Sequence, residues 1–298
     1  MRGGEFLAWR CRELRLGGEA HEFDWLLDLC GALSRRELQL VLIDRNRSVE
    51  LRRSLDDLDV LWKKYLDQNI PLQYLAGVCP WRDLLLEVGP AALIPRQESE
   101  VLPDLALAVP RAQPIRRWAD LGTGSGALAI SLARAWPDAV GHAVDRSADA
   151  LALAACNLGR YGLGAACQLH HGSWWEPVLP WFGQLDLVMS NPPYIPSDLI
   201  KSLAPNVRDH EPTLALDGGG DGLDCIRSIV AGAAQALAPG GWILLEHHYD
   251  QSERVLALLG EAGLSNVGAA LDHCGIARFA MACRPAEDVG AHQPRNRL

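Results

Sequence analysis

The sequence has no long apolar run and no obvious export signal. No stretch of about 18 consecutive apolar residues occurs, so we expect no transmembrane helix and no membrane partner. The segment Met1–Leu16 is interrupted by arginines and holds no apolar core before a cleavage site, which argues against a secretory signal. We therefore expect a cytoplasmic protein.

Metal-binding patterns are also missing. The eight cysteines are scattered, and no two of them form a C-x2-C pair, so the sequence does not support a zinc site. Unpaired cysteines of this kind are typical of reduced thiols. His170-His171 and His247-His248 do not indicate a metal either, because adjacent side chains on a strand point to opposite faces. We expect no metal.

The chain lacks the basic excess of a nucleic-acid-binding protein. Its net charge is −9, and residues 1–77 carry 12 basic and 13 acidic side chains, so most of the negative charge lies after them. Proteins that grip nucleic acid through its phosphates need a basic face. We expect no directly bound nucleic acid. We also expect a monomer, and the length of 298 residues suits one large domain or two ordinary ones.

In the first 71 residues, the apolar positions recur with the spacing of a helix. Ser34 and Glu37 form a capping box that opens a third helix, and a fourth is expected from about Leu51 to Asn69, ended by Pro71. A helical bundle has no chemistry of its own. A substrate-docking module over residues 1–71 and a packing or dimerisation module both stay open.

The remaining chain divides into three segments. Glycines and prolines punctuate residues 72–97, which predicts a β-hairpin connector. Strands and helices alternate over residues 98–283, which predicts an α/β fold with a doubly wound, mostly parallel sheet and helices on both faces. Residues 284–298 are polar with proline and glycine and are expected to form a loose tail.

A glycine-rich turn opens the α/β region. The strand Trp118–Leu121 leads into Gly122-Thr123-Gly124-Ser125-Gly126 and then into a helix over Ala127–Ala135. Glycines allow the tight turn and let the backbone approach a ligand closely. The next strand, Ala139–Val144, ends in Asp145, where a carboxylate can accept hydrogen bonds from ribose hydroxyls. A dinucleotide and S-adenosylmethionine both fit this pattern.

Two features favour S-adenosylmethionine. The spacing G-x-G-x-G differs from the dinucleotide fingerprint G-x-G-x-x-G. Asp120 also precedes the glycine turn, where a carboxylate can meet the ammonium group of a methionine moiety but would repel a pyrophosphate. The alternative for Asp120 is a capping acid for the following helix.

The tetrapeptide Asn191-Pro192-Pro193-Tyr194 follows an apolar strand, Leu185–Ser190. Two prolines cannot continue a central strand, because neither has an N–H to donate. The Asn191 oxygen and the Pro192 carbonyl can each accept an N–H from a planar NH2 group, and Tyr194 can stack on its plane. The alternative is an ordinary turn. In a doubly wound sheet this loop should face the glycine turn across the switch point, where ligands bind.

Together these motifs resemble the class I S-adenosylmethionine methyltransferases that act on planar NH2 groups. Three further stretches, Pro71–Gly77, Leu93–Glu100 and Glu211–Gly219, resemble the HemK/PrmC family. Its members methylate the side-chain nitrogen (N5) of a glutamine in the Gly-Gly-Gln motif of peptide chain release factors. The resemblance is close over residues 71–283. It implies a seven-stranded sheet, a glutamine methyltransferase acting in translation termination, and a release-factor partner.

The resemblance also implies roles for single residues. The methyl donor would lie against Asp120, Asp145 and the turn Gly122–Gly126, with Trp174 beside the adenine and Asn191 near both substrates. Asn191, Pro192 and Tyr194 would be the catalytic groups, and all four residues of Asn191–Tyr194 would hold the glutamine. The chain departs from the family pattern at positions away from both motifs: Pro80-Trp81-Arg82, Gln97, His210 and His247-His248.

Three other functions compete with this interpretation. Methylation of a ribosomal-protein glutamine uses the same chemistry, and the sequence separates it poorly from release-factor methylation. Adenine-N6 methylation of DNA also targets a planar NH2 group, on a flipped base, but should carry a basic recognition region. A non-catalytic binding module should have lost Gly124, Asp145 or Asn191, and all three are present.

Overall fold

A computed structural model describes residues 1–286 and divides the chain into two compact units. Met1–Ile94 and Lys201–Thr213 form the first unit, and Pro95–Ile200 with the chain from Leu214 onward forms the second. The tail expected at residues 284–298 lies outside the described residues from position 287. Among the residues that are described, no helix is both long and apolar enough to cross a bilayer.

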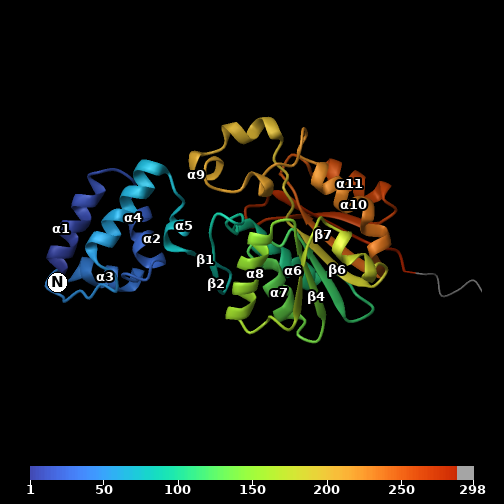
Figure 1. The fold of residues 1–298 in the computed structure, drawn as a ribbon, viewed down its shortest axis with the longest axis horizontal. Coiled ribbons are helices and arrows are strands. Elements are labelled where there is room, and N and C mark those ends of the chain that lie inside the picture. The colour runs from blue at the N-terminus through green and yellow to red at the C-terminus, as the bar shows by residue number, and fades with distance from the viewer. Residues whose placement is uncertain (287–298) are drawn as a thin grey trace, which may run out of the picture. The chain divides into compact units, whose positions relative to one another are not determined.

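The first unit contains the helical bundle (Figure 1). Its elements are α1 (Gly3–Leu14), α2 (Ala20–Leu29), α3 (Arg35–Ile43), α4 (Leu55–Gln68), α5 (Leu72–Ala76), β1 (Val78–Trp81), β2 (Leu84–Glu87) and α9 (Pro205–Arg208). Phe23 and Trp62 are fully buried and pack edge to face, with their ring centroids 4.8 Å apart. The predicted capping box is confirmed: the Glu37 N–H donates to Ser34 Oγ, and Glu37 Oε2 accepts from the Ser34 N–H.

Two details of this unit differ from the prediction. Helix α4 begins at Leu55 rather than Leu51, because the Ser54 hydroxyl caps it by accepting from the Asp57 N–H at 3.1 Å. It ends at Gln68, before Pro71, where Asn69 takes a left-handed conformation with φ of 53°. The short helix α5 was not expected. The hairpin is present, with β1 and β2 antiparallel, while the division at residues 71 and 97 stays a prediction.

The second unit is built on a seven-stranded sheet in the order β5-β4-β3-β6-β7-β9-β8. All pairs are parallel except those of β9, which runs antiparallel to β7 and β8. The strands are β3 (Arg117–Leu121), β4 (Val140–Asp145), β5 (Cys167–His171), β6 (Leu185–Ser190), β7 (Leu237–Glu246), β8 (Ser265–Leu271) and β9 (Ala277–Cys283). The predicted doubly wound, mostly parallel sheet is confirmed.

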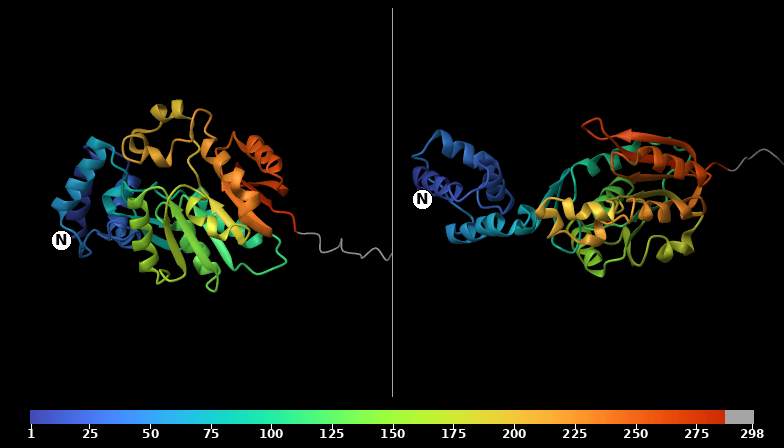
Figure 2. Two further views of the ribbon diagram at one scale, coloured as in Figure 1. Left: turned by 45° about the vertical axis from the view of Figure 1, so that its right-hand side comes forward. Right: turned by 90° about the horizontal axis from the view of Figure 1, so that it is seen from above.

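Helices cover both faces of this sheet (Figures 1 and 2). One layer is α6 (Val101–Ala108), α7 (Ala127–Ala135) and α8 (Ala148–Arg160); the other is α10 (Asp224–Ala236) and α11 (Ser252–Glu261). Short 3-10 turns occupy Glu98–Glu100, Glu176–Trp181, Ser197–Ser202 and Thr213–Ala215. Strands covered on both faces read as near-continuous apolar runs, which is why Leu185–Ser190 could be recognised from sequence.

Candidate functional site

The carboxyl ends of β4, β3, β6 and β7 lie side by side along one edge of the sheet, since these strands are parallel neighbours. The glycine turn leaves β3 and the Asn191 loop leaves β6, so the structure brings the two predicted motifs together. The Ser190 hydroxyl ties the two strand ends by donating to the Leu121 carbonyl at 2.5 Å. This is the switch-point edge at which open α/β sheets bind ligands.

The glycine turn is held open by its backbone geometry. Gly122, Gly124 and Gly126 all have positive φ, at 78°, 55° and 86°, a region that L-residues with side chains rarely adopt. A Cβ on Gly126 would also meet the Cβ of Ala154 at 3.2 Å. The side-chain amide of Asn157 donates to the Ser125 carbonyl at 2.9 Å, which fixes the turn against α8.

Asp120 is fully buried beneath this turn. The Thr123 hydroxyl donates to its Oδ2 at 2.7 Å, whereas its Oδ1 has no hydrogen-bond partner within the described part of the chain. Burial raises the pKa of Asp120 to about 7, and the nearby Asp145 carboxylate also raises it. An unsatisfied buried acceptor is costly, so this atom suits a ligand that brings a charged N–H.

Asp145 is the last residue of β4 and has two backbone partners. Its Oδ2 accepts from the Gly124 N–H at 2.9 Å, and its Oδ1 accepts from the Ser147 N–H at 2.8 Å. A carboxylate offers about four acceptor positions, so two bonds leave room for ribose hydroxyls. Asp145 also shapes the glycine turn, which the sequence did not indicate.

The adjacent tryptophans separate into two environments. Trp175 is buried and donates its indole N–H to the Ile229 carbonyl at 2.9 Å, so it belongs to the core. Trp174 is half-buried with a left-handed φ of 46°. Its ring lies against the turn, within 3.4 Å of where a Cβ on Gly122 would be. Of the pair, only Trp174 contacts the glycine turn with its ring.

The Asn191 loop is fixed by polar contacts behind it. The Asn191 side-chain NH2 donates to Ser99 Oγ at 2.9 Å, and the Tyr194 hydroxyl donates to Glu246 Oε1 at 3.2 Å. Pro192 is buried and Pro193 half-buried. The bond to Ser99 uses the nitrogen end of the Asn191 amide, which leaves its oxygen as the end for another ligand.

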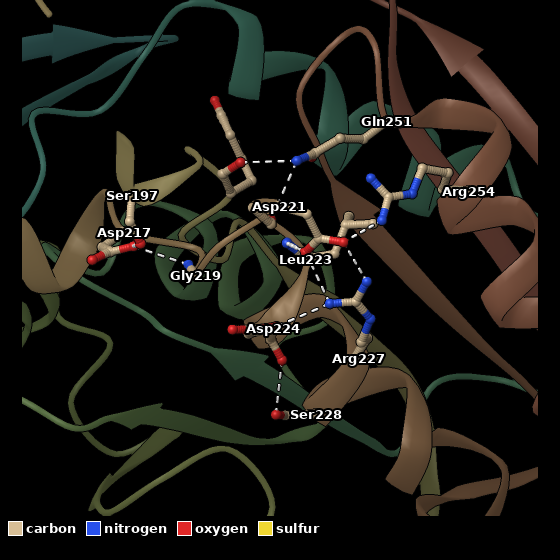
Figure 3. A network of polar contacts seen from close by, with 12 residues as sticks. Ser197, Asp217, Gly219, Asp221, Leu223, Asp224, Arg227, Ser228, Gln251 and Arg254 are labelled. Atoms are coloured by element: carbon tan, nitrogen blue, oxygen red, sulfur yellow. Dashed lines mark hydrogen bonds and ion pairs between the residues drawn. The ribbon is translucent and has the colours of Figure 1, made fainter. Parts of the chain in front are cut away.

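A second loop braces the backbone of this segment (Figure 3). Gln251 is buried, and its side-chain NH2 donates to the carbonyl oxygens of Tyr194, at 2.9 Å, and Gly222, at 3.2 Å. The neighbouring glycine-rich stretch, residues 217–222, is held by Asp221, which forms ion pairs with Arg227, at 2.5 Å, and Arg254. Gln251 therefore connects the Asn191 loop to this stretch.

Sequence reasoning missed Ser99, Glu246 and Gln251. Glu246 carried a signal, because it ends a buried strand in the same way that Asp145 ends β4. Ser99 lay within a stretch that carried the family resemblance, but nothing local indicated its partner. Gln251 had no local signal, since a buried glutamine cannot be told from an exposed one by sequence alone.

The two pairs of adjacent histidines lie in different settings, and only one pair is on a strand. His247 and His248 come after the end of β7, so the alternation of strand side chains does not apply to them. His170, on β5, instead meets His142 of β4, with Nε2 and Nδ1 3.0 Å apart. Throughout residues 1–286, no three His, Cys, Asp or Glu side chains gather closely enough to hold a metal ion.

Comparison with known proteins finds relatives that are all described as methyltransferases. The family described as methyltransferase small domain matches residues 104–203. A release factor glutamine methyltransferase from Prochlorococcus marinus is 50% identical over 94% of this chain and 97% of its own. Others from Thermosynechococcus vestitus and Gloeobacter violaceus are 44% and 46% identical, covering 80% and 81% of this chain and 82% of each relative.

Among solved structures, the hMettl16 catalytic domain, in complex with MAT2A 3'UTR hairpin 6, aligns with a TM-score of 0.51. The alignment covers 82% of this chain and 87% of that chain, at 17% sequence identity. At this level of identity the likeness concerns the fold alone.

Proposed function

Because this chain belongs to the family of release factor glutamine methyltransferases, we propose that it methylates the side-chain amide nitrogen of a glutamine in a peptide chain release factor, with S-adenosylmethionine as donor. One observation carries the proposal for the site: the pairing of β3 with β6, which sets the Asn191 amide beside the glycine turn. The residue roles below follow from that juxtaposition.

The glycine turn and its neighbours fit the donor. Asp120 Oδ1, buried and unsatisfied among the described residues, would accept from the ammonium of the methionine moiety. Asp145 would accept from the ribose hydroxyls, and Trp174 would cover the adenine. Backbone at Gly122 to Gly126, including Thr123 and Ser125, would line the rest. When bound, S-adenosylmethionine supplies an electrophilic methyl group on a sulfonium.

The Asn191 loop fits the glutamine acceptor. Asn191 Oδ1 and the Pro192 carbonyl would each accept one N–H of the glutamine side chain, while Pro193 and the Tyr194 ring confine its plane. An amide nitrogen is a poor nucleophile, because its lone pair is delocalised; the barrier to amide rotation is about 18–20 kcal/mol. Acceptors fixed in advance stabilise the positive charge that builds on the nitrogen. They also orient the nitrogen lone pair toward the methyl group.

The remaining features of the proposal rest on charge and sequence pattern. The net charge of −9 favours a protein partner over directly bound nucleic acid. We also propose that the enzyme is a cytoplasmic monomer and that residues 1–71 help to dock the release factor. The nitrogen needs no prior deprotonation in this scheme, since its proton can leave after the methyl group has arrived.

Asn191→Ala tests the acceptor clamp. Removing one preorganised hydrogen-bond partner typically costs about 2.7–4 kcal/mol of barrier, or 10²–10³ in rate. Single-turnover rates at saturating donor should fall by about that factor, while calorimetry should find the donor affinity nearly unchanged. Tyr194→Phe should be milder than Tyr194→Ala, because the ring is kept.

The exposed Asn46, in the first unit, provides a matched control. Asn46→Ala removes the same side chain at a position far from both motifs in sequence and should keep wild-type turnover. If Asn191→Ala also turned over at the wild-type rate, the loop would be an ordinary turn and the proposed clamp would be wrong.

A further inference from the structure

A chain of hydrogen bonds runs from the Asn191 amide into the core. The Asn191 NH2 donates to Ser99 Oγ at 2.9 Å, and Ser99 Oγ donates to Glu246 Oε2 at 2.6 Å. The other oxygen of the same carboxylate, Glu246 Oε1, accepts from the Tyr194 hydroxyl at 3.2 Å. One buried carboxylate therefore holds both polar side chains of the acceptor loop.

Three separate elements bring these groups together. Glu246 ends β7, and its preceding residue Leu245 pairs with Ser190, the last residue of β6. Asn191 follows directly, so the strand register places the carboxylate behind the acceptor loop. Ser99 comes from the 3-10 turn Glu98–Glu100 at the start of the second unit. Ser99 and Glu246 are both buried.

The direction of these hydrogen bonds decides which end of the Asn191 amide faces the acceptor glutamine. An asparagine amide has an oxygen that accepts and an NH2 that donates, on a nearly symmetric frame. A serine hydroxyl has one proton, and Ser99 gives it to Glu246. Ser99 can then only accept from Asn191, so the NH2 must face it and Oδ1 must face away. The reversed amide would present NH2 to an incoming glutamine NH2, donor against donor.

We infer that Glu246, acting through Ser99, sets the orientation of the Asn191 amide so that its oxygen faces the acceptor glutamine. Ser99 and Glu246 are thus positioning residues for the methyl transfer, and neither touches the reacting atoms. Tyr194 is held by the same carboxylate, which couples the ring to the amide. The inference rests on the proposed function of Asn191 as an acceptor clamp.

The charge of Glu246 controls the donor-to-acceptor direction of the hydrogen bonds between Glu246, Ser99 and Asn191. Ionised, the carboxylate accepts from both hydroxyls; protonated, it can donate to Ser99, whose own proton is then free to turn toward Asn191 Oδ1. Burial raises the pKa of Glu246 to about 7, the bonds from Ser99 and Tyr194 lower it, Glu98 raises it and Arg278 lowers it. The clamping orientation should therefore become more populated as the pH rises through about 7.

Nuclear magnetic resonance on the full-length protein reports this orientation without turnover. The side-chain amide signals of Asn191, assigned by their loss in Asn191→Ala, should shift with a midpoint near the pKa of Glu246. Ser99→Ala breaks the connection, so its Asn191 signals should lose this transition. The exposed Ser228, whose hydroxyl donates to a helix carbonyl, offers Ser228→Ala as a matched control that keeps it.

Kinetics on a Gly-Gly-Gln peptide give the second readout. Glu246→Gln preserves shape but supplies an NH2 that can donate to Ser99, which favours the reversed amide. Both Glu246→Gln and Ser99→Ala should lower kcat by about tenfold or more, less than loss of Asn191 itself, and leave donor affinity within about twofold. Glu253→Gln, at an exposed site on α11, should behave as wild type.

The outcomes separate this inference from the proposed function. If Asn191→Ala is slow but Ser99→Ala and Glu246→Gln turn over at the wild-type rate, the positioning role is wrong and the clamp stands. An Asn191 signal that shifts with the same midpoint in Ser99→Ala as in the wild type contradicts the role, even where Glu246→Gln fails to fold. If Asn191→Ala itself is fast, the proposed function fails first.

Discussion

Two buried carboxyl groups, Asp120 and Glu246, lie at the same edge of the sheet, and the pKa of each is raised. Burial is the largest influence on both and raises each pKa to about 7. Glu246 is satisfied by two hydroxyl donors, whereas Asp120 keeps Oδ1 without a partner among the described residues. The satisfied carboxylate of Glu246 suits a positioning role, whereas the Oδ1 oxygen of Asp120 suits the binding of a cationic ligand.

Donor binding should release a proton from Asp120. Because folding raises the pKa of Asp120, the free energy of unfolding falls as the pH rises from about 4, the pKa in the unfolded chain, to about 7. An ammonium group beside it favours the ionised form and reverses that shift. At pH 6 the free group is mostly protonated, so binding of S-adenosylmethionine should release about one proton.

Calorimetry in buffers of different ionisation enthalpy measures this release. Asp120→Asn cannot ionise, so it should bind the donor more weakly and without the proton release. Equal release by Asp120→Asn and the wild type would show that the proton comes from elsewhere and would remove the support for an Asp120–ammonium pair.

At the scale of the element, the turn between β3 and α7 depends on glycine at its last position. Gly126 combines a φ of 86° with contact distances of 3.2 Å and 3.3 Å from a built Cβ to the Cβ and Cα of Ala154. The chain cannot relax away from α8 without moving the start of α7. The turn is therefore set by packing between two helices as well as by its own sequence.

Gly126→Ala should destabilise the protein and weaken donor binding. The left-handed backbone alone costs an L-residue about 1–2 kcal/mol, and the contact with Ala154 adds to it. Gly159→Ala is the matched control, because Gly159 lies in α8 with open space around its Cβ position; it should be neutral or stabilising by up to about 1 kcal/mol. Urea unfolding compares the two, and equal stability would contradict the packing argument.

At the scale of the whole molecule, the chain separates into two compact units, and the site described above lies within the second. The first unit has its own apolar core around Phe23, Leu58 and Trp62. All strands of the large sheet and the site residues themselves belong to the second unit, although the long connection after β6 includes Lys201–Thr213 of the first unit. Donor binding and glutamine binding should therefore be separable from the docking of a whole protein substrate.

A chain that starts at Pro71 tests this separation. It should bind S-adenosylmethionine with an affinity within about twofold of the full chain and should still methylate a short Gly-Gly-Gln peptide. Methylation of an intact release factor should fall by about tenfold or more, because about 1.4 kcal/mol of docking free energy corresponds to that factor. Equal losses on peptide and protein would mean that the helices are only structural.

The sequence by itself determined the features that depend on neighbours along the chain. The capping box at Ser34, the glycine turn before Ala127 and the strand Leu185–Ser190 all follow from local rules of capping, left-handed turns and buried apolar runs. The adjacency of β3 and β6 followed from the topology of a doubly wound sheet. Together these placed both motifs at one edge.

Only the tertiary structure decided which polar side chains meet behind those motifs. Ser99 and Glu246 are 147 residues apart, and Asn191 is 92 residues from Ser99. Local patterns specify that a strand is buried, but a hydrogen bond between distant side chains depends on strand order, register and the depth at which each side chain ends. For the same reason, the orphaned oxygen of Asp120 and the brace from Gln251 became visible only in the folded chain.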